Sequence, residues 1–339
     1  MILVTGSTGL VGSHLLYKLT ETEDSIRALY RTDSKLETVK HIFSYYSEDF
    51  EERFNKIEWY NADITDLPKL IDAFNGITYV YHCAALVSFD PNDYYTLRHV
   101  NIDGTANIVN LCLSHNVKKL CYVSSIAAVG LSTDDSLTKE SSEWNKEEDH
   151  NVYAITKYGA EMEVWRGTQE GLDAVIVNPG VIVGPGFWNA SSSSLFKQIH
   201  KGLKYYTKGI TGYIDIFDVV DIMIKLYQSD FKNERYILIA ENISFKTFIT
   251  KVAEKLKVKP PKKEASLLLL KIAWRIDWLR QLITSKKRKL TKHLVTSLTC
   301  TRKYSNKKIS DALDYKFKPI DVSISEVCQF YLEDLKNPS

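Results

Sequence analysis

Short apolar runs alternate with amphipathic stretches along the first half of the chain. Runs of this length suit buried strands, and apolar positions at three- and four-residue spacing between them suit helices. The order predicts an α/β protein whose doubly wound parallel sheet is covered by helices on both faces. The expected strands are residues 2–5, 26–30, 57–62, 79–83, 120–124 and 174–178, and the expected helices include 10–19, 93–115 and 153–168.

The pattern changes in the second half. Residues 180–212 carry glycines and a serine run without strong periodicity, and residues 213–240 return to the strand–helix–strand style of the first half. The chain after them is mostly helical. We therefore expect a doubly wound domain at 1–179, rejoined by 213–240, and a smaller, mostly helical domain made of 180–212 and 241–339.

Composition and charge exclude several classes of protein. The 339 residues carry 44 Lys and Arg against 42 Asp and Glu, and a net charge of +2 gives no general drive toward nucleic acid. The five cysteines are an odd number without a C-x-x-C pair, so we expect neither a disulfide framework nor a metal site. We also expect no transmembrane segment and a cytoplasmic location, because no long apolar run or leader-like segment is present.

A glycine-rich turn follows the first expected strand. Gly6, Gly9 and Gly12 are spaced by three residues and lead into the first helix. In such a turn the first glycine permits the bend, the second lets backbone approach a pyrophosphate, and the third lets helix pack on strand. The residues expected to cradle the dinucleotide are Gly6, Ser7, Thr8, Gly9, Leu10, Val11 and Gly12.

The G-x-x-G-x-x-G spacing resembles the short-chain dehydrogenase/reductase superfamily, and the chain length points to its extended branch, the NAD(P)-dependent epimerase/dehydratase type. The resemblance implies a Rossmann dinucleotide-binding domain followed by a substrate-binding domain. It also implies that Asp63 and Ile64 contact the adenine, although Asp63 or Thr65 could equally cap a helix. The small residues Ala84 and Ala85 would let the backbone pass close to the dinucleotide, whereas the neighbouring His82 is better explained as a packed residue.

The end of the second strand bears on the choice of cofactor. An acidic residue there would hold the ribose 2′-hydroxyl of NAD, but this chain has Tyr30 followed by Arg31, with Lys35 close behind. A guanidinium matches a phosphate in charge and geometry. We therefore expect NADP rather than NAD, with Arg31 and Lys35 at the 2′-phosphate; the alternative is a solvated surface arginine.

Tyr153 and Lys157 lie four residues apart and share one face of an expected helix. A nearby ammonium favours the phenolate and should lower the tyrosine pKa from its usual value near 10. The spacing alone is weak evidence, because Tyr304 and Lys308 repeat it. Position favours the first pair, since its helix follows the strand that ends in Ser124 and Ser125, and ligands bind at carboxyl ends of such strands.

The resemblance assigns roles to these residues. In the extended family the catalytic serine is the last of the serine run, which gives the triad Ser125, Tyr153 and Lys157, with Ser124 as the alternative. Asn101 matches a motif that orders the site, although it could be an ordinary helix residue. Residues Pro179, Gly180 and Val181 would border the nicotinamide. The triad implies hydride transfer with Tyr153 as the acid or base.

Motif details favour the reductase branch, which resembles dihydroflavonol 4-reductase and 3β-hydroxysteroid dehydrogenase. The segments 126–130 and 177–186 lack the aromatic and acidic residues usual in sugar epimerases and dehydratases. We therefore expect an NADP(H)-dependent oxidoreductase acting on a hydrophobic ketone, aldehyde or secondary alcohol. A nucleotide-sugar epimerase with NAD and a non-enzymatic NADP-sensing protein are the alternatives, and a homodimer through helices 93–115 and 153–168 is plausible by resemblance.

Residues 266–283 form a very apolar expected helix that carries Lys271, Arg275 and Arg280, with a basic run just beyond it. Two interpretations remain open from the sequence. The helix could lie on a membrane surface, or it could pack on the core and end in a solvated basic turn. We favour packing on the core.

Overall fold

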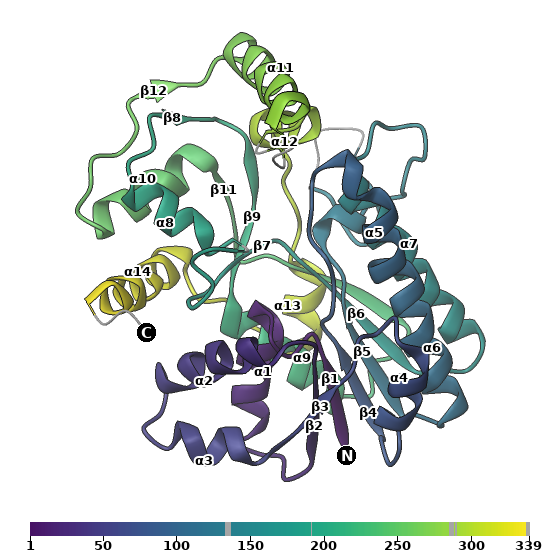
Figure 1. Cartoon of the computed structure of the whole chain (residues 1–339). Helices are drawn as coiled ribbons and strands as arrows, with labels where there is room; N and C mark the ends of the chain where they lie inside the picture. The colour runs from purple at the N-terminus through teal and green to yellow at the C-terminus, as the bar shows by residue number, and fades with distance from the viewer. Residues whose placement is uncertain (133–136, 191, 285–287, 289, 337–339) are drawn as a thin grey trace.

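A central sheet of seven parallel strands organises the computed structural model, which describes residues 1–132, 137–190, 192–284, 288 and 290–336 (Figure 1). The strand order is β10-β6-β5-β4-β1-β2-β3, so the order reverses between β1 and β4. Ligands bind at such a reversal in open α/β sheets. The strands are β1 (Ile2–Thr5), β2 (Ile26–Tyr30), β3 (Ile57–Asn61), β4 (Tyr79–His82), β5 (Lys119–Val123), β6 (Ala174–Pro179) and β10 (Glu234–Leu238).

Helices cover both faces of this sheet, which confirms the predicted doubly wound fold. Side chains alternate along each strand, so Val4 joins the core cluster beneath one layer of helices and Leu3 the cluster beneath the other. The first layer holds α1 (Leu10–Leu19), α2 (Leu36–Ser44) and α9 (Ile216–Gln228), and the second holds α4 (Leu67–Ala73), α6 (Gly104–Ser114) and α7 (Val152–Gln169). Short helices α3 (Phe50–Asn55), η1 (Asp33–Lys35), η2 (Pro91–Asp93) and η4 (Ile126–Ala128) lie between these elements.

The helix expected over 93–115 contains an irregular turn. It runs as α5 (Tyr94–Arg98), a π-turn η3 (His99–Asp103) and α6. The wider turn carries Asn101, which is buried with 1% of its surface exposed. Such bulges are frequent at functional sites.

A second, smaller sheet leads into the helical lobe. It has the order β11-β9-β7 and consists of β7 (Val181–Val183), β9 (Ile210–Asp215) and β11 (Glu241–Ser244). An apolar cluster joins it to α8 (Ser194–His200), α10 (Phe245–Lys255) and α14 (Ile320–Lys336). The remaining elements are β8 (Tyr205–Tyr206), β12 (Lys263–Glu264), α11 (Leu267–Thr284), α12 (Lys292–Thr299) and α13 (Lys307–Leu313).

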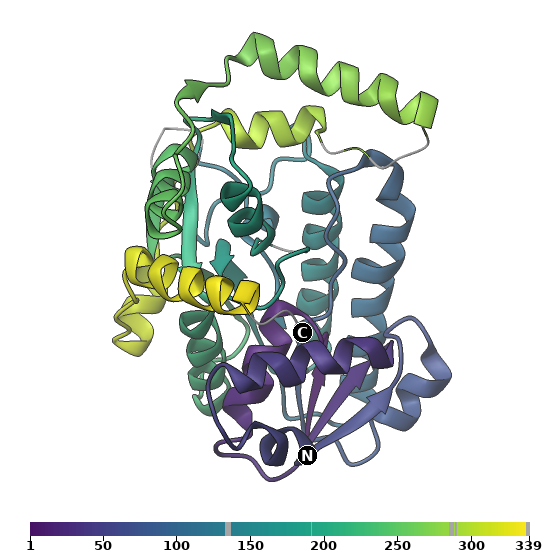
Figure 2. The same cartoon turned by 60° about the vertical axis from the view of Figure 1, so that its left-hand side comes forward.

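The helix α11 corresponds to the very apolar segment 266–283, and our preference for packing on the core is wrong. It lies at the edge of the helical lobe above α12, as both views show (Figures 1 and 2). Leu270 is its one buried residue, in a small cluster with Ala265 and Val295. No helix in the described part of the chain is long and apolar enough to cross a membrane.

Candidate active site

The glycine turn between β1 and α1 is closed by contacts that tolerate no side chain. Gly6 has φ +65°, a conformation that glycine adopts without strain, and its carbonyl accepts the amide of Gly9 at 3.0 Å. A Cβ on Gly12 would lie 2.3 Å from that same carbonyl oxygen. A Cβ on Gly6 would lie 2.5 Å from the amide nitrogen of Ala84, so the backbone just after β4 requires glycine at position 6.

The start of α1 suits a bound anion. Gly9 precedes the helix and has no side chain with which to cap it. The first turn, which begins with Leu10 and Val11, contains no acidic residue. The free amides and the helix dipole are therefore available to a phosphate. The buried hydroxyl of Ser7 donates to the carbonyl of Leu29 and so fixes the turn to β2. This turn fits a dinucleotide pyrophosphate.

Arg31 and Asp63 meet at the ends of β2 and β3. The Arg31 Nη1 lies 3.3 Å from Asp63 Oδ2, and 60% of the Arg31 side chain is exposed. Burial alone would raise the Asp63 pKa, but hydrogen bonds from the Thr65 amide and hydroxyl, together with Arg31, hold that pKa below its usual value. Helix α4 begins after Asp66, so neither Asp63 nor Thr65 is its cap.

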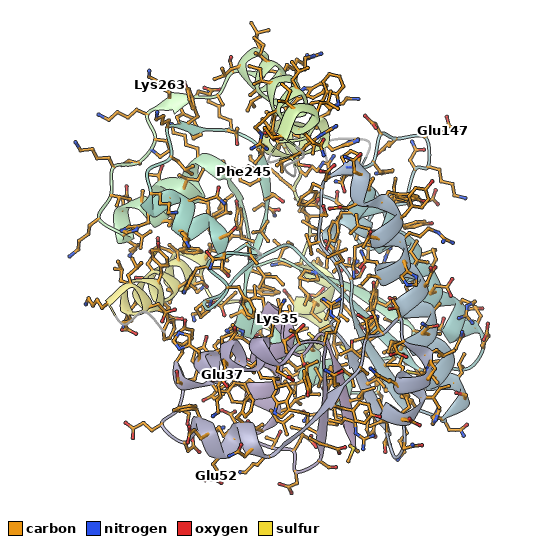
Figure 3. All side chains as sticks on the ribbon, in the orientation of Figure 1. Lys35, Glu37, Glu52, Glu147, Phe245 and Lys263 are labelled. Carbon is orange, nitrogen blue, oxygen red and sulfur yellow. The ribbon has the colours of Figure 1, made fainter. Side chains whose placement is uncertain are left out.

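The other predicted nucleotide-side residues differ in how accessible they are. Lys35 is exposed at the end of η1, just before α2 and four residues after Arg31 (Figure 3). Thr8 is partly exposed and Ala85 is exposed, whereas the side chain of Ile64 is buried in the core and packs on Gly104. A contact from Ile64 to a nucleotide would therefore have to come from its backbone.

His82 is a packed residue, as the sequence interpretation favoured. Its two ring nitrogens are 2.7 Å from the Thr5 hydroxyl and 2.9 Å from the Thr105 hydroxyl. Burial lowers its pKa to about 3, with a further contribution from Lys157, so the ring is neutral. A neutral, fully buried imidazole joins β4 to β1 and α6 through its hydrogen bonds and carries no charge with which to act as a general acid.

The two serines after β5 have different surroundings. Ser124 is buried and donates to Glu161 Oε2 at 2.6 Å. Ser125 is partly exposed, its hydroxyl accepts the amide of Ala127 at 3.1 Å, and it lies close enough to Tyr153 to lower the pKa of that phenol. The structure therefore brings Ser125, the preferred serine of the sequence interpretation, to the tyrosine.

Tyr153 and Lys157 lie in the first two turns of α7. Burial raises the Tyr153 pKa, and the hydrogen bond from Ser125 opposes this. The Lys157 ammonium donates to Tyr122 Oη at 2.7 Å and to the Val123 carbonyl at 2.9 Å. Burial lowers the Lys157 pKa to about 7, although Glu161 acts in the opposite direction. The expected lowering of the Tyr153 pKa by Lys157 is therefore absent here, because the ammonium is directed at β5.

Sequence reasoning missed the buried carboxylate of Glu161. It is fully buried, and besides Ser124 it accepts Asn178 Nδ2 at 2.9 Å and pairs with Arg235 Nη1 at 3.0 Å. The Asn178 amide also donates to the Ser125 carbonyl at 3.0 Å. One sequence signal existed: positions 153, 157 and 161 follow each other by one helical turn on a single face of α7.

Asn101 ties two segments around the tyrosine. Its Oδ1 accepts the Leu86 amide at 2.7 Å, and its Nδ2 donates to the Leu86 carbonyl at 3.0 Å and to Thr156 Oγ1 at 3.1 Å. The ring of Phe89, from the same loop as Leu86, lies 5.7 Å from the ring of Tyr153. The π-turn thus positions both α7 and the loop after β4.

Residues 179–181 connect the two sheets. Pro179 ends β6, Val181 begins β7, and the amide of Gly180 donates to Leu238 at 3.1 Å. A Cβ on Gly180 would lie 2.4 Å from the carbonyl oxygen of Gly212. This segment therefore lies where the central sheet passes into the helical lobe.

The second Tyr–Lys pair does not form a comparable site. Tyr304 is buried and precedes α13, so it does not share a helix face with Lys308. The Lys308 ammonium pairs with Glu234 and donates to the carbonyl of Arg235. The structure accordingly leaves Tyr153 and Lys157 as the pair at the carboxyl end of the sheet.

Comparisons with known proteins bear on the family and the fold of this chain. The sequence profile of the NAD dependent epimerase/dehydratase family matches residues 2–239. A putative dihydroflavonol 4-reductase of Synechocystis is 29% identical over 80% of this chain and 77% of its own. Cinnamoyl-CoA reductase 1 of Petunia hybrida is 28% identical over 75% and 77%. A UDP-glucose 4-epimerase from Thermotoga maritima has the same fold, with a TM-score of 0.77, 18% identity and coverage of 98% and 99%.

Proposed function

The chain belongs to the NAD dependent epimerase/dehydratase family, the extended short-chain dehydrogenase/reductase enzymes, and we propose that it is an NADP(H)-dependent reductase. Its substrate is a hydrophobic ketone or aldehyde, or the secondary alcohol in the reverse direction. The observation that carries the proposal is the placement of Ser125, Tyr153 and Lys157 together at the carboxyl end of β5, where Ser125 lowers the pKa of Tyr153 against burial and Lys157 donates to the Val123 carbonyl. The reductase names of the two sequence relatives support the branch.

The chain's own groups divide the work of the reaction. The hydride of the reaction would come from, or return to, a nicotinamide held at the carboxyl end of the sheet. Tyr153 Oη gives a proton to the carbonyl oxygen, or takes one from the alcohol, and Ser125 Oγ donates a hydrogen bond to that oxygen as its charge develops. Lys157 would hold the ribose of the cofactor once its ammonium turns from Tyr122 Oη toward that ribose, and in that position its positive charge would favour the phenolate of Tyr153.

The nucleotide end supports NADP. Tyr30 takes the place where an acid would bind the ribose of NAD, and the exposed Arg31 guanidinium is held by a single contact with Asp63. Arg31 and Lys35 together offer two cations to a 2′-phosphate. The weak contact of Arg31 leaves its guanidinium free to turn toward that phosphate.

The apolar surroundings of the tyrosine support a hydrophobic substrate. The ring of Phe89 packs edge-on against Tyr153. The neighbouring segments contribute Ile126, which is partly buried, and the exposed Val87. Such side chains favour an apolar group next to the reacting carbonyl, in line with the names of the reductase relatives.

Turnover of a carbonyl panel with NADPH tests the proposal. The purified protein should oxidise NADPH with aryl or alkyl ketones and aldehydes, and Tyr153→Phe should lower kcat/KM by about 10²–10⁴-fold while NADPH binding survives. Tyr304→Phe is the matched control, although its buried ring calls for a check of folding. Equal activity of Tyr153→Phe and the parent protein would overturn the assignment.

A nucleotide-sugar epimerase is the second candidate, because the family and the Thermotoga neighbour include that activity. An epimerase would retain NAD through purification and interconvert UDP-sugars without net oxidation of the cofactor. Nucleotide sugars therefore belong in the same panel. Their turnover, together with inactivity toward simple carbonyls, would replace the reductase proposal with the epimerase one.

A further inference from the structure

The outer face of α11 is apolar and exposed. Leu268 is 70% exposed, Ile276 60%, Leu282 63% and Ile283 83%. Large apolar patches rimmed by polar groups mark interaction sites, whereas single exposed apolar residues need no explanation. The other exposed apolar side chains of this helix are Leu267, Leu269, Ile272, Trp278 and Leu279.

Helical geometry separates this face from the packed one. At about 100° per residue, positions 268, 272, 275, 279 and 283 fall within one arc, and Leu270, Trp274 and Asp277 fall on the opposite side. The opposite side packs on α12 through Leu270 and Trp274. Helix α12 is in turn joined to the loop before α7 by an ion pair of 2.9 Å between Lys292 and Asp149. The apolar arc therefore lies on the side of α11 away from α12, and Figure 2 shows α11 above α12 at the edge of the molecule.

The charges on α11 follow the same division. Lys271 and Arg275 are exposed on or beside the apolar arc, and Arg280 lies at its other edge. The single acidic residue of the helix, Asp277, faces inward, pairs with Arg280 at 2.8 Å and accepts the amide of Leu290 at 2.9 Å. The outward surface is thus apolar and cationic.

We propose that α11 is a membrane-surface helix that docks this protein on an anionic lipid bilayer. Its apolar arc enters the boundary between headgroups and acyl chains, and Lys271 and Arg275 extend their charged ends to lipid phosphates. A two-fold contact between two copies of this face would instead bring cations against cations, with no carboxylate on the outer arc to neutralise them. Charge complementarity therefore favours lipid over a second copy.

Vesicle flotation of the full-length protein tests the proposal. The protein should float with vesicles of phosphatidylcholine mixed with phosphatidylglycerol and should remain largely free with phosphatidylcholine alone. Ile276→Glu combined with Ile283→Glu should weaken binding about a hundredfold, because two apolar side chains no longer leave water. Lys271→Gln combined with Arg275→Gln should weaken it by roughly twentyfold, and added salt should do the same to the parent protein.

The matched control is Ile71→Glu, which places the same charge at an exposed isoleucine of α4, far from α11 (Figure 1). It should leave flotation unchanged. All variants should keep the melting temperature and NADPH affinity of the parent protein, so that a failed reductase assay and a failed membrane assay are distinguishable. Parent protein that stays free of anionic vesicles would overturn the proposal. The proposal would also be overturned if the parent protein bound no lipid and sedimented as a dimer that the Ile276→Glu, Ile283→Glu double variant abolishes.

Discussion

Replacement of Glu161 by glutamine isolates the contribution of a buried charge to the candidate active site. The carboxylate is fully buried and accepts hydrogen bonds from Ser124 at 2.6 Å and Asn178 at 2.9 Å. It also pairs with Arg235, whose side chain is 18% exposed. Glutamine keeps the shape of the side chain, but it removes the negative charge and turns an N–H₂ group toward one of these donors.

The size of the effect follows from those contacts. Removing one partner of a buried ion pair costs about 3–5 kcal/mol. Arg235 keeps some water and also donates to the carbonyl of Glu140 at 2.8 Å, so we expect the lower end, about 3 kcal/mol. For a chain of 339 residues, with an unfolding entropy of about 2 cal/mol/K per residue, that corresponds to a melting temperature lower by roughly 4 °C. The free energy of unfolding of a natural protein is only about 5–15 kcal/mol, so the loss is easily measured.

Urea denaturation and a pH profile measure the two consequences. Glu161 raises the Lys157 pKa against burial, so Glu161→Gln should lower that pKa further below about 7. The limb of the kcat/KM profile that reports Lys157 should therefore move to lower pH, which a purely structural loss would not cause. The control is Glu163→Gln on the same helix, which only breaks a surface pair with Arg166 and should cost about 0.5 kcal/mol or less. Equal stability of Glu161→Gln and Glu163→Gln would refute the reasoning.

Three further changes test other parts of the site. Arg31→Ala should weaken NADPH binding about 10–100-fold in fluorescence titrations, because a charge-assisted contact to the 2′-phosphate is lost, and should leave NADH binding nearly unchanged. Arg98→Ala, at a similarly exposed arginine, is the control and should change the affinity for neither cofactor. Gly12→Ala should lower the affinity for both cofactors at least about tenfold, since its Cβ would lie 2.3 Å from the Gly6 carbonyl oxygen; unchanged affinity would contradict the tight turn. Burial lowers the Lys157 pKa to about 7 in the folded protein, below its value of about 10.4 in the unfolded chain. Burying the charged ammonium therefore lowers the free energy of unfolding by its full amount below pH 7, and by less as the pH rises from 7 toward the unfolded pKa. Lys157→Met should therefore stabilise the fold at pH 6 more than at pH 9 in urea titrations, and a constant difference would argue against the lowered pKa.

The sequence by itself determined the features that depend on neighbours along the chain. The strand–turn–helix of residues 2–19 follows from a short apolar run, three glycines and helical periodicity, and the structure places β1 and α1 at the expected residues. The shared face of Tyr153 and Lys157 follows from the helix repeat alone. These predictions succeed because hydrogen bonds of a turn or helix join residues within a few positions.

Tertiary structure decided the features that depend on distant partners. Ser124 and Ser125 are adjacent residues of the same type, and their different roles depend on distant partners: Ser124 donates to Glu161, whereas Ser125 acts on Tyr153. The direction of the Lys157 ammonium likewise depends on where β5 lies, and the spacing of residues along the sequence does not contain that information.

The helix α11 makes the same point for a surface. Its apolar composition predicted a helix correctly, but composition cannot say which side of a helix other elements will cover. Only the placement of α12 against Leu270 and Trp274 leaves the opposite arc exposed. Burial is a property of the assembled layers, and the same apolar residues stabilise a core when covered or form a binding surface when left in water.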